Sequence, residues 1–474
     1  MVRIWPASQF PRLLRPMPAK PTTCVIGAGI SGLTAGKAFS DWDLPYSCFE
    51  ASDDIGGNWY FRNPNGRSSA YQSLHIDTSR DGVSFRDMPM GPDEYPDYPH
   101  HAQILGYLHR YADAFSLRDR IRFETPVELA ERKAGGGWRI TLGDGSKEEF
   151  DFLVVGNGHH WDPRFPDFPG SFDGETIHGH HYIGPSDPLD LYGRRVLVVG
   201  IGNTAVDITS ELSRKGVAEK VFLSTRSGAW VMPKYFLGRP TDTLVKVNPR
   251  LPLSWQRRMA RILPRLASGR MEDFGLPHPN HNFLEAHPTV SSELLLRLGS
   301  GDAVAKPNVE RLEGGSVHFE DGSVEQIDVI IYATGYKITF PFFDPEFLSA
   351  PDNRLPLYKR IFSPGIDDLA LIGFAQAIPT LFPFVELQSK LVARYVGGDY
   401  ALPPIAEMEE TIHRDDAIHT ATFSDRPRHT MEIEWYTYEH DLWSREIPAG
   451  RERADGGMGP KLSGRVVTAE AAAA

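Results

Sequence analysis

Short apolar runs that end in glycine recur along the chain. In residues 22–39 (TTCVIGAGISGLTAGKAF) and 195–212 (RVLVVGIGNTAVDITSEL), the run passes through a glycine turn into a helical pattern. Residues 152–158 (FLVVGNG) carry the same run and turn without a clear helix, and residues 329–336 (VIIYATGY) give a fourth strand signal. Strands that alternate with glycine turns and helices predict parallel α/β sheets, in which ligands bind at the carboxyl ends of the strands.

Two hairpin patterns lie between these runs. Residues 137–150 alternate around Gly-Asp-Gly, and residues 316–330 repeat the pattern around Asp-Gly. Each half thus holds a glycine turn, a hairpin and a later strand, which predicts two related, doubly wound Rossmann-like domains, the second inserted into the first. The expected parts are an N-terminal extension at 1–20, the first domain at 21–170 and 326–450, the second at 171–325 with a helical insertion around 245–290, and a flexible tail at 451–474.

The first glycine turn has the GxGxxG spacing of a dinucleotide site. It follows a strand and opens a helix, so its glycines permit a tight turn, backbone approach to a pyrophosphate, and close helix packing. The pyrophosphate then meets free N–H groups at the positive end of the helix. Glu50, 18 residues past the last glycine, has the place of the acid that holds a ribose hydroxyl. The motif consists of Gly27, Ala28, Gly29, Ile30, Ser31 and Gly32.

The second glycine turn, Gly200-Ile201-Gly202-Asn203-Thr204-Ala205, lacks an acid at the end of its second strand. Thr225 and Arg226 stand there instead. A guanidinium suits a 2′-phosphate, which a carboxylate would repel, so this site predicts NADP rather than NAD. Two dinucleotide sites in one chain predict a flavoprotein that takes hydride from NADPH, with FAD at the first site and NADPH at the second.

Between the two turns stands the pattern FxGxxxHxxxY, which identifies a known family. It appears as Phe172, Gly174, His178 and Tyr182. The chain here resembles the flavin-containing monooxygenases, and the resemblance extends over roughly residues 21–404. Further matching segments are EASDDIGGNWYF (50–61), YPDYPHHAQILGYLHRYA (95–112), RSGAWVMP (226–233) and YATGY (332–336).

The resemblance implies a defined reaction and a set of cofactor contacts. NADPH would reduce FAD, dioxygen would add at flavin C4a, and the hydroperoxide would oxygenate nitrogen or sulfur of small lipophilic molecules, as in N,N-dimethylaniline monooxygenases. Such a site must exclude water. Ile76, Asp77 and Thr78 would lie near both the isoalloxazine and the nicotinamide. Other FAD contacts would be Gly27–Gly32, Glu50, Gly57, Asn58, Trp59, Val127 and Gln388. NADP contacts would be Gly200, Gly202, Asn203, Thr204, Ala205, Val206, Asp207, Thr225 and Arg226.

Asp77 is a departure from the family, which commonly has asparagine at this position. A carboxylate cannot donate a hydrogen bond, and its charge would oppose a developing anion. A neutral carboxyl group could donate if burial raised its pKa. We therefore expect Asp77 to be the catalytic residue, to make the reaction depend on pH, or to increase wasteful peroxide release.

Composition narrows the classes of partner. With 50 Lys and Arg against 62 Asp and Glu, the chain of 474 residues carries a formal charge of −12, which argues against general binding to nucleic acid. No apolar run is long enough for a transmembrane helix. Residues 246–270 carry seven basic and no acidic side chains, which fits either a membrane-touching helix or, our preferred interpretation, a solvated insertion or lid. Cys24 and Cys48 are expected to be buried free thiols.

We expect a cytoplasmic homodimer that starts at Met1 or Met17 and binds no metal, since the paired histidines lack supporting ligands.

Three alternatives for the function stay open. Ketone oxygenation of the Baeyer–Villiger type uses the same flavin, but its enzymes normally show Trp-Pro after the linker histidine, where Tyr182-Ile183 stands here. A flavin reductase or oxidase is the second, although the absence of CxxC disfavours a disulfide reductase. A nucleotide-binding protein without catalysis is the third.

Overall fold

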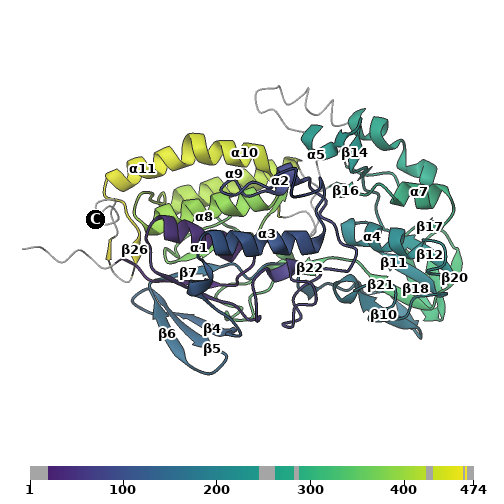
Figure 1. Ribbon diagram of the computed structural model, residues 1–474, viewed down its shortest axis with the longest axis horizontal. Helices are drawn as coiled ribbons and strands as arrows, with labels where there is room; N and C mark the ends of the chain where they lie inside the picture. Colours follow the sequence, from purple (N-terminus) through teal and green to yellow (C-terminus); the bar gives the residue numbers. More distant parts are fainter. Residues whose placement is uncertain (1–19, 245–261, 282–287, 423–430, 463–464, 467–474) are drawn as a thin grey trace, which may run out of the picture.

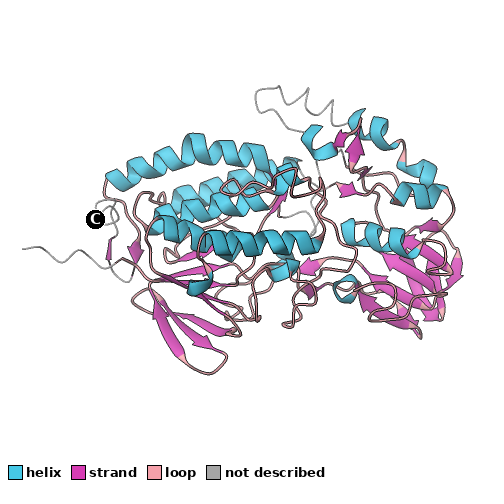
Figure 2. Ribbon diagram, in the orientation of Figure 1, coloured by secondary structure: helices cyan, strands magenta, loops and turns pink. Residues whose placement is uncertain are grey.

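The computed structural model describes residues 20–244, 262–281, 288–422, 431–462 and 465–466. Two α/β units lie side by side along the long axis of the molecule (Figure 1). Figure 2 shows that each unit stacks helices against strands. The doubly wound α/β fold class predicted from the glycine turns is confirmed.

The first unit is built on a parallel five-stranded sheet. Alternate residues of β1 point to opposite faces, so Val25 packs under the helices while Cys24 and Ile26 face the other layer. The helices α1 (Ile30–Asp41), α3 (His101–Ala114) and α8 (Phe382–Val396) cover one face, and a three-stranded sheet covers the other. In order, the sheet runs β23 (Leu369–Leu371), β7 (Phe152–Val155), β1 (Thr23–Ile26), β2 (Tyr46–Phe49) and β3 (Ile121–Arg122), and the covering strands are β4 (Val127–Arg132), β5 (Trp138–Leu142) and β6 (Lys147–Phe150).

The second unit repeats this plan. Val196 and Val198 of its central strand pack beneath helices, and Leu197 and Val199 pack against a second layer of strands. The parallel sheet runs β10 (Glu175–His178), β21 (Val329–Tyr332), β11 (Arg195–Val199), β12 (Lys220–Ser224) and β17 (Ala303–Lys306), with α4 (Asn203–Leu212) and α7 (Leu294–Gly299) on one face. The other layer is β20 (Val324–Gln326), β19 (Ser316–Phe319), β18 (Val309–Gly314) and β9 (Gly170–Phe172).

Two expected boundaries were wrong. β21 pairs with β10 and β11 of the second unit, so residues 326–332 do not belong to the first. The strand is buried on both faces, and its apolar run alone does not say which sheet it joins. The tail also begins later than 451, because α11 (Ile447–Asp455) continues to Asp455 and β26 (Lys461–Leu462) then pairs with β27 (Arg465–Val466).

The helices after α8 close the first unit at its outer side (Figure 1). They are α9 (Ile405–Thr422), α10 (Trp435–Asp441), the π-helical turn η6 (Leu442–Glu446) and α11. Among the described residues, no helix combines the length and the apolar character needed to cross a bilayer.

The predicted insertion around 245–290 is described only in part. Residues 262–268 are helical, and the rest of the basic segment at 245–261 lies outside the described residues. The approach to it consists of β13 (Val231–Met232), the hairpin β14 (Tyr235–Phe236) and β15 (Arg239–Pro240), and α5 (Thr241–Leu244). It is followed by η4 (Met271–Phe274) and β16 (Thr289–Val290), which pairs with β13.

Candidate functional site

The first glycine turn is a cradle that only glycine can form. Gly27 has a φ of +94°, and a Cβ there would lie 2.8 Å from the Gly156 carbonyl oxygen. A Cβ on Gly32 would lie 1.8 Å from the Gly27 oxygen. Gly29 is the residue before α1 and has no side chain that could accept a hydrogen bond. It therefore leaves the first N–H groups of the helix uncapped. This geometry fits a dinucleotide pyrophosphate.

Glu50 lies at the end of β2, beside this cradle. Its carboxylate accepts the N–H of Ala28 at 2.7 Å and the N–H of Ser52 at 2.8 Å. The side chain is 5% exposed, and burial raises its pKa although these N–H groups oppose the rise. Thr125 donates its N–H to the Glu50 carbonyl, and this bond brings Val127, the first residue of β4, to the same corner. The structure thus joins the predicted acid and Val127 to the first turn.

The turn η1 (Gly57–Trp59) packs against the same cradle. Gly57 has a φ of +55°, and a Cβ there would lie 3.1 Å from Gly29 Cα. The amide oxygen of Asn58 accepts hydrogen bonds from the N–H and hydroxyl of Ser69, at 2.9 and 2.8 Å. Trp59 meets the ring of Phe382 edge-on, so it packs in the core while standing beside the site.

Gln388 uses both ends of its amide within the protein. The side chain is fully buried, its oxygen accepts the Gly373 N–H at 2.9 Å, and its NH₂ group donates to the Arg360 carbonyl at 3.1 Å. A Cβ on Gly373 would lie 2.5 Å from Ser31 Oγ, so this loop runs against the first turn of α1. Gln388 therefore supports the wall of the cradle, and its direct contact to FAD stays a prediction.

The second glycine turn has the same features. Gly200 has a φ of +134°, and a Cβ there would lie 2.3 Å from the Ala333 carbonyl oxygen. Gly202 begins α4 without a side-chain cap, and the Asn203 side chain accepts the Val290 N–H at 3.0 Å. Arg226 is exposed and forms no ion pair with the described residues. The cradle and the open guanidinium fit an NADP molecule.

The motif between the two turns is structural. A Cβ on Gly174 would lie 2.5 Å from the Asp328 carbonyl oxygen. His178 accepts the His180 N–H at 3.0 Å through its ring nitrogen, and the Tyr182 hydroxyl donates to Glu211 of α4 at 2.7 Å. This segment therefore fastens the second unit to the chain that enters it, as expected for a linker.

A cluster of charged groups joins the two units, and we call it the seam cluster: Tyr71, Asp77, Asp207 and Lys234. Lys234 Nζ lies 3.8 Å from Asp77 Oδ1 and donates to the Ile76 carbonyl at 3.2 Å. Tyr71 donates its hydroxyl proton to the carboxylate of Asp207 on α4. Asp77 Oδ1 is buried without a hydrogen-bond partner among the described residues. The predicted catalytic residue thus lies where the two units meet.

The surroundings of the seam cluster raise the pKa of both carboxyl groups. Burial, and then the charge of Asp207, raise the pKa of Asp77 to about 8, and this rise exceeds the opposing effects of Lys234 and Asn203. Burial also raises the pKa of Asp207 to about 6, against the hydrogen bond from Tyr71 and the charge of Lys234. Near neutral pH, Asp77 can therefore carry a proton and donate a hydrogen bond, as an asparagine would.

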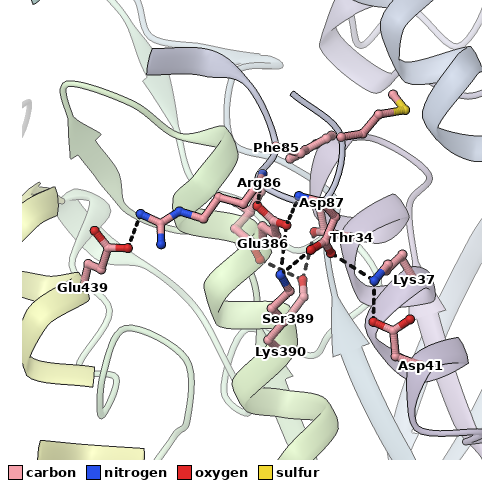
Figure 3. A network of polar contacts seen from close by, with 12 residues as sticks. Thr34, Lys37, Asp41, Phe85, Arg86, Asp87, Glu386, Ser389, Lys390 and Glu439 are labelled. Carbon is pink, nitrogen blue, oxygen red and sulfur yellow. Dashed lines mark hydrogen bonds and ion pairs between the residues drawn. The ribbon is translucent and has the colours of Figure 1, made fainter. Parts of the chain in front are cut away.

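The segment after Asp77 is held on the other side. Thr78 donates its hydroxyl proton to the Pro379 carbonyl at 2.7 Å, just before α8. Further along, the α8 network of Lys37, Asp87, Glu386 and Lys390 binds the chain to α1 and α8 (Figure 3). The Glu386 carboxylate accepts the N–H groups of Arg86 and Asp87 at 2.7 and 3.0 Å.

Sequence reasoning missed Tyr71 and Lys234. Lys234 directly follows the matched segment at 226–233, and this adjacency is the one signal that could have suggested it. Its contact spans 158 positions, so no local pattern reveals it. Among the described residues, no group of three or more His, Cys, Asp or Glu side chains is arranged to hold a metal ion.

Comparison with known proteins places the chain in a family. Residues 20–449 match the model of the family described as Flavin-binding monooxygenase-like. Flavin-containing monooxygenase 5 of Rattus norvegicus is 36% identical over 436 residues, which cover 87% of this chain and 80% of that protein. The N-oxide-forming dimethylaniline monooxygenase 2 of the same organism is 35% identical over 444 residues, or 88% and 81% of the two chains. A solved S-allyl-L-cysteine S-oxygenase from Allium sativum is 25% identical, with a TM-score of 0.67 over 92% of this chain and 89% of that one.

The chain therefore belongs to the flavin-binding monooxygenase family. It is a flavoprotein monooxygenase that uses FAD and NADPH, and the predicted family, enzyme class and cofactors are confirmed. The roles of individual residues toward these cofactors stay predictions.

Proposed function

We propose that this monooxygenase oxygenates nitrogen or sulfur centres of small lipophilic molecules, with Asp77 in its protonated form as the hydrogen-bond donor of the site. The bound flavin supplies the activated oxygen. The chain itself binds the two nucleotides at its glycine cradles and presents Asp77 where the two units meet. Support comes from the names of its relatives, which include an N-oxide-forming dimethylaniline monooxygenase and an S-oxygenase.

The observation that carries the choice of substrate class is the pair of carboxyl groups in the seam cluster. Attack by an amine or sulfide needs an electrophilic oxygen donor, which a neutral hydrogen-bond donor supports. Ketone oxygenation needs a negatively charged oxygen donor, and charge on Asp77 or Asp207 would oppose that charge. With the pKa of Asp77 raised to about 8, the neutral form prevails near pH 7 and favours the first chemistry.

Product analysis tests the proposal. The FAD-loaded enzyme is given NADPH, oxygen and a matched panel of a tertiary amine, a thioether and a cyclic ketone, and products are identified by mass. We expect N-oxide or sulfoxide that carries one atom of ¹⁸O from labelled oxygen gas. Lactone as the main product would establish the ketone alternative. NADPH oxidation that yields hydrogen peroxide alone, at every pH, would establish an oxidase.

Location and assembly are part of the same proposal. We propose a cytoplasmic homodimer without stable attachment to membranes, on the acidic composition and the preference for residues 246–270 as a solvated insertion. Sedimentation of cell fractions and light scattering of the purified enzyme test this. Recovery in the membrane pellet would favour the basic segment as an anchor.

A further inference from the structure

Lys234 stands between carboxyl groups that come from both units. Asp77 belongs to the segment that follows the first cradle, whereas Asp207 belongs to α4, which follows the second. Lys234 lies in the short connection between β13 and β14, and both its backbone and its side chain are held. Its N–H donates to Ser292 Oγ at 3.0 Å, and its ammonium group donates to the Ile76 carbonyl. The Asp77 and Lys234 side chains are each 20% exposed, so water screens their interaction only in part.

The anchoring of Lys234 is more extensive than an ion pair requires. Its carbonyl accepts the Tyr98 hydroxyl proton, and its ammonium lies 5.0 Å from the centre of the Tyr98 ring. Because the ammonium is held on a backbone carbonyl next to Asp77, it cannot follow the carboxylate as a free surface lysine would. The distance of 3.8 Å gives attraction without a hydrogen bond, so Asp77 Oδ1 stays free to meet a ligand.

Burial and a small group of neighbours set the charge of Asp77. Burial opposes ionisation most strongly and Asp207 opposes it too, whereas Lys234 and the amide of Asn203 favour it. Asp207 in turn faces Tyr71, Lys234 and the more distant acids of α4 and the following segment. On the solvent side, Lys234 also acts on His75. Besides Asp77, Asp207 and Lys234 themselves, the titratable groups around them are Tyr71, His75, Tyr98, His100, Glu211 and Glu293.

We propose that Lys234 is a positioning residue for Asp77: its anchored ammonium fixes the carboxyl group in the seam and decides, against Asp207, when that group becomes charged. The proposal concerns the same site as the proposed function and rests on it for the role of Asp77. It goes further, because it assigns the pH limit of the enzyme to a lysine that need not touch substrate.

Two variants separate the effect of the Lys234 charge from that of its hydrogen bond to the Ile76 carbonyl. Lys234→Met removes the ammonium, and Lys234→Gln keeps a donor for the Ile76 carbonyl without the charge. Loss of a cation within about 4–6 Å raises the pKa of an acid by roughly 1–3 units. Both variants should therefore shift the alkaline limb of the pH profile of kcat/KM for NADPH to higher pH by that amount. Lys234→Arg should restore the profile. In Asp77→Asn this limb should be absent.

A second readout does not depend on activity. Between pH 7 and 9, Asp77 becomes charged in the wild type, and the charged form needs Lys234. The drop in Tm caused by Lys234→Met in the FAD-loaded enzyme should therefore be larger at pH 9 than at pH 7. In an Asp77→Asn background this pH dependence should disappear. The matched control is Lys220→Met, because Lys220 also donates to a backbone carbonyl, that of Gly301, far from the seam cluster.

The outcomes are distinguishable from those of the substrate proposal, because neither readout identifies a product. An unchanged alkaline limb in both Lys234→Met and Lys234→Gln would overturn the inference. So would an equal loss of Tm at pH 7 and pH 9, since that would show a purely structural role. If the methionine variant does not take up FAD, the glutamine variant decides.

Discussion

The α8 network and the seam cluster each hold two buried or half-buried carboxyl groups, but the number of donors close to those groups differs. In the α8 network, Asp87 meets Lys37 at 3.1 Å and Lys390 at 2.8 Å, and Glu386 meets Lys390 at 3.0 Å (Figure 3). Burial would raise the pKa of Asp87, but the hydrogen bonds from Lys390 and Lys37 prevail and lower it. At Glu386, burial raises the pKa although the Arg86 N–H and the charge of Lys390 oppose the rise. Two lysines and two backbone N–H groups thus face the two acids, and they outweigh burial at Asp87 only.

The seam cluster offers one lysine for two carboxyl groups, and that lysine stays beyond hydrogen-bond distance of Asp77. Burial prevails there, and the pKa of both acids rises. The comparison of Asp87 with Asp77 teaches that two ammonium groups at hydrogen-bond distance can outweigh burial and lower the pKa of a carboxyl group, whereas one lysine beyond that distance does not. The α8 network holds the chain, and the seam cluster is poised for chemistry.

Breaking the α8 network should cause the largest loss of stability. Glu386→Ala leaves two N–H groups without their acceptor and removes one of the two carboxylate partners of Lys390, at a place where the Glu386 side chain is 3% exposed. Removal of one partner from a buried ion pair costs about 3–5 kcal/mol. We expect the midpoint of urea unfolding to fall accordingly.

A surface ion pair provides the control for that experiment. Glu149 pairs with Lys133 at 2.9 Å, and its side chain is 54% exposed. Glu149→Ala should change the free energy of unfolding only slightly, because water screens an exposed ion pair. If Glu386→Ala lowered the free energy of unfolding no more than this control, the α8 network would contribute no more than an exposed ion pair, and the contrast between the two clusters would fail.

Asp77→Asn should have a smaller effect that depends on pH. In the unfolded chain an aspartate ionises near pH 4, whereas in the fold the pKa of Asp77 is about 8, so the folded state holds its proton over this range. Wild-type stability therefore falls as pH rises from about 4 to 8 and then levels off. The asparagine variant loses no proton, so its Tm should exceed that of the wild type by on the order of 1–4 °C at pH 8–9 and by little near pH 4.

Scanning calorimetry of the FAD-loaded proteins across pH measures this difference. The same variant should also lose the pH dependence of the coupling between NADPH consumed and product formed. A Tm difference that is constant from pH 4 to 9 would show that Asp77 ionises normally, and the proposed role of its proton would have to be abandoned.

The sequence could predict those features of the fold and the site that depend on residues close together along the chain. The cradles at Gly27 and Gly200 were predictable because an apolar strand, a glycine turn and a helix stand within 20 consecutive residues. The hairpins at 137–150 and 316–330 were predictable for the same reason, and both form, as β5–β6 and β19–β20.

What the sequence could not show depends on contacts between distant segments. Tyr71 and Asp207 are 136 positions apart, and Asp87 and Lys390 are 303 apart. Asp77 stood out because it departs from the family pattern, but its raised pKa comes from burial and then from Asp207, neither of which has a local signature. The sheet that β21 joins was missed for the same physical reason, since strand pairing is decided by packing of the whole unit.

Tyr71→Phe gives the smallest and finest test of the comparison. The Tyr71 ring is 3% exposed and packs edge-on against Tyr182, and phenylalanine preserves this packing. The variant removes only the hydroxyl that donates to Asp207. A hydrogen bond to a charged group contributes roughly 1.5–3 kcal/mol, so the loss should be near this range above pH 6, where Asp207 is charged, and smaller below it.

Tyr182→Phe is the matched control, because its hydroxyl donates to Glu211 outside the seam cluster. Chemical unfolding at pH 5 and pH 8 should show a step in the cost of Tyr71→Phe and none in that of the control. Equal costs at both pH values would mean that Asp207 is a fixed anion like Asp87, and the seam cluster would then be a second structural network.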